Sequence, residues 1–204
     1  MVEIKRRKTD RRTLYTIRVI KDAFIKLVKE ESYSKVTITQ ICREADITRS
    51  TFYLHFTSIT DVLNAVLNDV LFLVQESATG LDTEDHYSFD YLNKNESLVP
   101  ACQQIGDSDK YQSLLMDPDL SEYIIGRIVA HERGKVLLLI IKKTGLSKED
   151  AETLFTYIIH GSFAVNRANY FQKNEKWAHD VQMLNRFTKA GYEKLANNAC
   201  LTNE

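Results

Sequence analysis

Residues 37–56 read TITQICREADITRSTFYLHF, and this stretch decides the fold of the N-terminal part of the chain. Thr37 followed three residues later by Gln40 matches a capping box, which predicts the start of a short helix. Asp46 predicts a tight turn, because aspartate tolerates a left-handed backbone better than most residues. Thr48 can cap a second short helix. Two short helices joined by a tight turn form a helix-turn-helix.

Each of the two short helices has one apolar side and one polar side. The apolar side is expected to be buried, and its residues are Ile38, Ile41, Cys42, Ala45, Ile47, Phe52 and Phe56. The polar side of the second helix presents Arg49, Ser50 and Tyr53. The end of such a helix is small enough to enter the major groove of DNA.

Charge is distributed unevenly along a chain whose net charge is only −1. Residues 1–60 carry an excess of six positive charges, whereas residues 61–204 carry an excess of seven negative charges. A basic segment beside an acidic one predicts that only the first meets a polyanion. We expect residues 1–11 to form a flexible arm whose cations add salt-dependent affinity for DNA. The basic residues that we assign to DNA from this part of the chain are Lys5, Arg6, Arg7, Lys8, Arg11 and Arg12.

The whole chain predicts an all-α protein. Only 2 Pro and 7 Gly occur among 204 residues, and apolar positions recur with helical period. We predict helices over about 12–31, 58–77, 118–143, 147–170 and 175–196, besides the two short ones. The three cysteines lack metal or redox spacing, and no transmembrane segment or signal core is present, which predicts a cytoplasmic protein without metal or cofactor.

The segment 12–74 resembles the DNA-binding domain of the TetR family. Thr37 opens the first short helix, and Thr51 precedes a run of Tyr-x-His-Phe that ends at Phe56, as in that family. The turn usually holds Gly where this chain has Asp46. Two further departures are Ser50, at a position that is often Gly, and Ile59, at a position that is often Lys. The resemblance implies that 12–74 is a DNA-binding domain and 75–204 a helical effector-binding and dimerisation domain.

The DNA contacts follow from chemistry and from this resemblance. Arg49 can pair with guanine through two hydrogen bonds, and the Thr51 methyl group can contact thymine. Thr37 and Thr48 can donate hydroxyl groups to phosphates, and the resemblance places Tyr53 and His55 at the phosphate backbone. The complete predicted set is Thr37, Thr39, Gln40, Thr48, Arg49, Ser50, Thr51, Tyr53 and His55.

The resemblance also implies that the last two long helices form a four-helix bundle with a second copy of the chain. Gly161 and Ser162 would permit close approach of the two copies. The apolar residues and the serine predicted in this interface are Leu154, Phe155, Ile158, Ile159, Ser162, Met183, Leu184 and Phe187.

Taken together, the sequence predicts a homodimeric repressor that binds a palindromic operator and is released by an effector of unknown identity. One alternative is a coactivator-type member of the family, whose C-terminal domain binds a protein instead of a small molecule. Another is a helical enzyme or interaction module in which the helix-turn-helix no longer binds DNA. No motif of catalysis or phosphate binding supports an enzyme.

Overall fold

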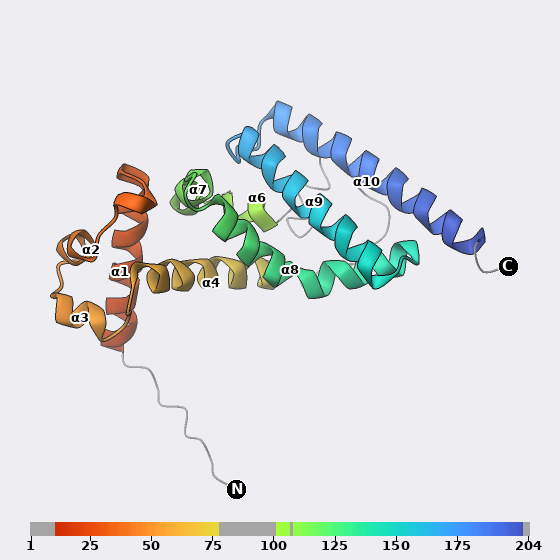
Figure 1. The fold of residues 1–204 in the computed structure, drawn as a ribbon. Helices are drawn as coiled ribbons and strands as arrows, with labels where there is room; N and C mark the ends of the chain where they lie inside the picture. Colours follow the sequence, from red (N-terminus) through yellow and green to blue (C-terminus); the bar gives the residue numbers. More distant parts are fainter. Residues whose placement is uncertain (1–10, 78–100, 107, 202–204) are drawn as a thin grey trace, which may run out of the picture. The chain divides into compact units, whose positions relative to one another are not determined.

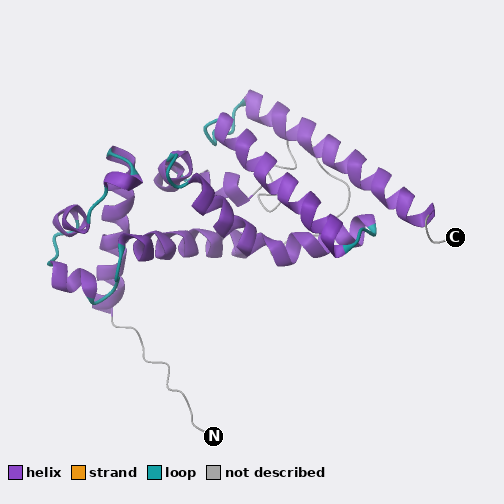
Figure 2. Cartoon of the chain, viewed as in Figure 1, coloured by secondary structure: helices purple, strands orange, loops and turns teal. Residues whose placement is uncertain are grey.

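A computed structural model describes residues 11–77, 101–106 and 108–201. All secondary structure in these residues is helical, which confirms the all-α prediction (Figure 2). The chain divides into two compact units, Met1–Asn68 and Asp69–Glu204. The division falls earlier in the chain than the boundary predicted after residue 74. None of the described helices has the length and apolar character that crossing a bilayer requires.

The first unit is built on α1 (Arg11–Glu30), which carries its buried core residues at helical spacing. The one-turn 3-10 helix η1 (Tyr33–Lys35) leads to α2 (Ile38–Glu44) and α3 (Arg49–Tyr53), and α4 (Ile59–Ser77) begins in this unit (Figure 1). The side chains of this unit that are least exposed are Ile20, Phe24, Ile41, Phe52, Val62, Leu63, Val66 and Leu67. The two short helices therefore rest on a core that α1 and the start of α4 supply.

The second unit contains α6 (Ala101–Gly106), α7 (Asp109–Met116), α8 (Ser121–Thr144), α9 (Lys148–Ala168) and α10 (Glu175–Leu201) (Figure 1). Gly145 ends α8 with a φ of 69°, and the Ser147 side chain caps α9 by accepting from the Asp150 amide, which agrees with the helix ends predicted near residues 143 and 147. Leu137, Ile140, Ala151 and Phe155 form a buried cluster between α8 and α9.

Two features of the second unit differ from the sequence-based prediction. The helices α6 and α7 lie in a stretch where no helix was predicted. The helix predicted to begin at about residue 118, at Pro118, begins later, because α8 starts at Ser121. Asp117 instead forms a separate turn, in which its carboxylate accepts from the Asp119 amide at 2.8 Å and its carbonyl accepts from the Leu120 amide at 3.2 Å. The buried Leu120 anchors that turn in the core.

The turn that follows α9 is held by α6. Tyr170 and Phe171 both have a φ of 54°, a left-handed conformation that is unfavourable for bulky residues. The Gln103 side chain donates to the Phe171 carbonyl at 2.8 Å, and the Phe171 ring packs against Phe163. A Cβ atom on Gly106 would lie only 2.5 Å from the Cβ of Phe171. Glycine is therefore required where α6 meets this turn.

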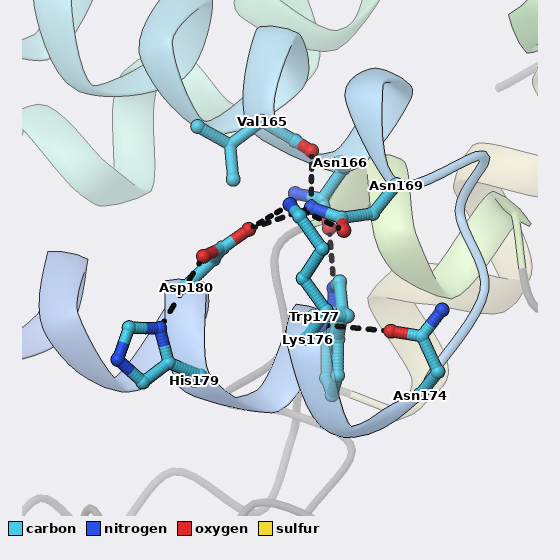
Figure 3. Close-up of polar contacts among 8 residues, drawn as sticks. All are labelled: Val165, Asn166, Asn169, Asn174, Lys176, Trp177, His179 and Asp180. Atoms are coloured by element: carbon cyan, nitrogen blue, oxygen red, sulfur yellow. Dashed lines mark hydrogen bonds and ion pairs between the residues drawn. The ribbon is translucent and has the colours of Figure 1, made fainter.

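A polar network ties the end of α9 to the start of α10 (Figure 3). The buried Trp177 indole donates to the Asn166 side-chain oxygen at 2.7 Å. Asn169 donates to Asp180 at 3.0 Å, and Lys176 donates to both of them, at 3.1 Å and 2.8 Å respectively. The hydrogen bonds from Lys176 and Asn169 lower the pKa of Asp180 to about 2. These contacts fix the direction in which α10 leaves the turn.

Candidate nucleic-acid interface

The capping box predicted at the start of α2 is present. The Thr37 hydroxyl accepts from the Gln40 amide at 3.2 Å, while the Gln40 side-chain oxygen accepts from the Thr37 amide at 2.8 Å. The Thr37 hydroxyl also donates to that same oxygen at 2.6 Å, so its proton is already engaged. Thr37 and Gln40 are therefore accounted for as the cap of α2, and their contacts with DNA stay predictions.

Side-chain contacts hold α2 against α1 and against Glu31, the residue that follows α1. The side-chain nitrogen Nε2 of Gln40 donates to both oxygens of the Glu31 carboxylate, at 3.1 and 3.2 Å. Lys26 Nζ donates a hydrogen bond to Glu44 Oε1 at 2.6 Å. This hydrogen bond and the attraction between the two charges raise the pKa of Lys26. Because a helix of seven residues has little stability of its own, these contacts and its buried residues hold α2 in place.

The turn between α2 and α3 is centred on Asp46, whose φ is 51°. The sequence predicted a left-handed residue here, where the TetR family usually has glycine. The Ile47 amide donates to the Cys42 carbonyl at 3.0 Å, which closes the turn across the end of α2. The departure from glycine thus leaves the turn intact.

The start of α3 carries three hydroxyl groups, and that of Thr48 contacts the other two. The Thr48 hydroxyl accepts from the Thr51 amide at 3.1 Å and caps the helix, as predicted. It also lies 2.8 Å from the Ser50 hydroxyl and 2.9 Å from that of Thr51. The three hydroxyls form a polar edge on α3.

The inward side of α3 is apolar, as predicted. Phe52 is fully buried, and its ring packs edge-on against Tyr53 and at a tilt against Phe56. This anchoring leaves Arg49 and Ser50 exposed, and Tyr53 is 49% exposed. These three side chains are therefore accessible for contact with the major groove of DNA.

The predicted DNA residues differ in accessibility. Those exposed are Thr37, Thr39, Thr48, Arg49, Ser50 and Tyr53, and those half-buried are Gln40, Thr51 and His55. Arg11 and Arg12 are exposed on the first turn of α1, whereas Lys5, Arg6, Arg7 and Lys8 lie outside the described residues.

Two exposed residues beside this surface were not among the predicted contacts. Arg43 lies in the last turn of α2 and is exposed. Leu54 follows α3 directly and is 79% exposed, more than the other large apolar side chains described. The sequence spacing could have predicted that Leu54 is exposed. Leu54 lies one helical turn after Ser50, on the side of the helix opposite Phe52 and Phe56.

The start of α4 is fixed by a second set of caps. The Ser58 hydroxyl accepts from the Asp61 amide at 3.1 Å, and the Asp61 carboxylate accepts from the Thr57 amide at 3.0 Å. A further hydrogen bond from the Thr57 hydroxyl is the largest contribution that lowers the Asp61 pKa. Tyr33 reaches the same end of α4, with its hydroxyl 3.1 Å from that of Thr60.

The residues predicted at a dimer interface fall into two groups. Phe155 is only 2% exposed in a single chain, and Leu154, Ile158 and Ile159 pack against the same cluster. Phe155 thus contributes to the core of its own chain, and the role of these residues in a dimer stays a prediction. By contrast Met183 and Phe187 are 54% and 62% exposed. Leu184 and Ser162 are half-buried.

Comparison with known families bears on the first unit. Residues 20–66 match the family model described as "Bacterial regulatory proteins, tetR family". The chain therefore contains a DNA-binding domain of the type found in TetR-family regulators. The matched residues run from within α1 into α4 and include both short helices, so the DNA-binding assignment rests on this domain. Searches of curated proteins and of solved structures gave no match.

Proposed function

We propose that this chain is a DNA-binding regulator of the TetR family, a repressor that binds a palindromic operator as a homodimer. The observation that carries the proposal is the arrangement of α3. Phe52 fixes the helix from within, while Arg49, Ser50 and Tyr53 are left exposed on a helix of the size that enters a major groove. The function proposed is binding, with no catalytic step.

The distribution of charge supports this assignment. The basic excess of residues 1–60 belongs to the part of the chain that holds the helix-turn-helix, and Arg11 and Arg12 are exposed there. Cations that neutralise phosphates release counterions, so the affinity for DNA falls steeply as salt rises.

The exposed apolar residues of the second unit support a homodimer. Met183 and Phe187 are four residues apart on α10, and therefore occupy one side of that helix. Tyr157 on α9 is 62% exposed, and a Cβ atom on Gly161, one turn later, would meet nothing within 4 Å. An exposed apolar stripe with room for close approach fits the helix-to-helix contact of a dimer.

Release by an effector requires that the effector bind unequally to the DNA-competent and DNA-incompetent states. We place its site in the second unit, as the family resemblance implies, and assign no residues to it. Both a small molecule and a protein satisfy the thermodynamic requirement.

Arg49→Ala tests the proposed contact. Duplexes enriched from a random pool by the wild-type protein supply the probe, and fluorescence anisotropy measures affinity. Loss of a bidentate pair to guanine should weaken binding by about 5- to 150-fold, corresponding to roughly 1–3 kcal/mol. Lys29→Ala, which removes an equal charge from the last turn of α1, is the matched control and should change affinity much less.

Circular dichroism should show the same helix content in both variants, because both side chains are exposed. Equal affinity of Arg49→Ala and wild type would remove Arg49 from the interface. Failure of the wild-type protein to bind any duplex would contradict the proposed function itself.

A further inference from the structure

The outermost line of α3 is formed by Ser50 and Leu54. An α-helix turns by about 100° per residue. Phe52 and Phe56 point inward, so the positions that lie opposite them are 50 and 54. The Leu54 amide donates to the Ser50 carbonyl at 3.2 Å, and the backbone of Leu54 is helical, with φ −70° and ψ −20°. The turn therefore continues through Leu54, which lies one turn beyond Ser50 on the same face.

Leu54 does not contribute to the core of its own domain. Its exposed fraction of 79% contrasts with the complete burial of Phe52 two residues earlier. Of the other leucines in the first unit, Leu27, Leu63 and Leu67 are buried, and Leu14 is 54% exposed. The Leu54 side chain is therefore available for an apolar contact outside its own domain.

The neighbours of Leu54 indicate the partner in that contact. Ser50 and Thr51, four and three positions earlier, place hydroxyl groups on the same side of the helix, so Leu54 lies on a largely polar face beside the half-exposed ring of Tyr53. Protein interfaces bury clusters of apolar side chains at their centre. A duplex presents isolated apolar groups instead, because the 5-methyl group of thymine is the apolar feature of the major-groove edge.

From this geometry we infer that Leu54 packs against the 5-methyl group of a thymine in each operator half-site. Leu54 is then a specificity-determining residue that favours thymine over cytosine at one position. The inference rests on the proposed function, since it assumes that α3 enters the major groove. It adds an apolar contact to the hydrogen bonds expected from Arg49, on a different side chain and at a different base.

Replacing thymine by deoxyuridine tests the inference, because this removes the methyl group and leaves base pairing unchanged. Each thymine of a selected duplex is replaced in turn, symmetrically in both half-sites, and affinity is measured by anisotropy. One replacement should weaken wild-type binding by about three- to fivefold per half-site, the effect of one buried methyl group. The same replacement should have no effect on Leu54→Ala, whose affinity for the unmodified duplex is already reduced.

Ser50→Ala is the matched control, because it alters the same face without removing an apolar contact. Its affinity should still fall on the sensitive deoxyuridine replacement. If the wild-type protein binds the selected duplex but tolerates every replacement, the Leu54 contact is refuted and the proposed function stands. If Leu54→Ala retains the full sensitivity, another residue reads the methyl group and the inference is wrong. If no duplex is bound at all, the proposed function fails and this inference with it.

Discussion

Gln40→Ala separates a structural role from a DNA contact for a residue that sequence reasoning assigned to DNA. The substitution removes the hydrogen bonds that the Gln40 side-chain oxygen accepts from Thr37 and those that its nitrogen donates to Glu31. We treat the contacts with Thr37 as one interaction and those with Glu31 as a second. Because the site is accessible to water, we assign each interaction a net contribution to stability of about 0.5 kcal/mol, the lower end of the usual range for hydrogen bonds. Alanine regains a few tenths of a kcal/mol through its higher helix propensity. We therefore expect the free energy of unfolding to fall by about 1 kcal/mol.

Urea unfolding followed by circular dichroism measures this change. A typical domain is stable by roughly 5–15 kcal/mol, so a loss of this size leaves nearly all molecules folded. The affinity of Gln40→Ala for a selected duplex should accordingly stay within about twofold of wild type, since 1 kcal/mol of stability does not change the folded population.

Thr39→Ala is the matched control, because Thr39 is exposed on the same helix and was also predicted at the DNA. It should show the opposite behaviour, with unchanged stability and weaker binding. The reasoning is refuted if Gln40→Ala leaves stability unchanged and lowers affinity tenfold, since this would place its side chain at the DNA.

Three further outcomes are expected. Phe52→Ala should cost about 3–5 kcal/mol of stability in urea, because the side chain is fully buried; a loss below 1 kcal/mol would contradict its anchoring role. Trp177→Phe should cost about 1–3 kcal/mol by leaving the buried Asn166 oxygen without its donor, and an unchanged unfolding midpoint would exclude this contribution. The pKa of Asp180 is lowered to about 2, so its stabilising contribution is present above the unfolded value near 3.9 and is lost as the pH falls through 2. Asp180→Asn should flatten the stability profile between about pH 4 and pH 2, and an unaltered profile would rule out this source of acid sensitivity.

The helix-turn-helix could be predicted because its determinants are local. The cap formed by Thr37 and Gln40 spans three residues, and the left-handed turn depends on the single residue Asp46. The same holds for Gly145 and Ser147, which end α8 and cap α9. Such signals act between neighbours in the chain, so they are visible in the sequence.

Features that depend on distant residues were not predictable in the same way. The pattern of α9 shows that Phe155 belongs to an apolar face, but the identity of the surface that covers it is set by α8. Similarly, nothing local indicates that the polar Gln103 is buried or that it bonds to Phe171, far along the chain. The cap formed by Gln40 was visible in the sequence, but its second hydrogen bond to Glu31 was not, because it depends on the packing of α2 near the end of α1.

The most direct test of the central claim is selection of binding sites from random duplex DNA by the full-length protein, with the enriched sequences read out. The account predicts an inverted repeat whose half-site centres are separated by about 10–10.5 base pairs or a multiple of it. This spacing places both copies of α3 on the same side of the DNA, one or more full helical turns apart. The guanine that Arg49 contacts should no longer be enriched with Arg49→Ala. The absence of any enriched sequence, or enrichment of the same sequence by Arg49→Ala, would contradict the claim that α3 reads an operator.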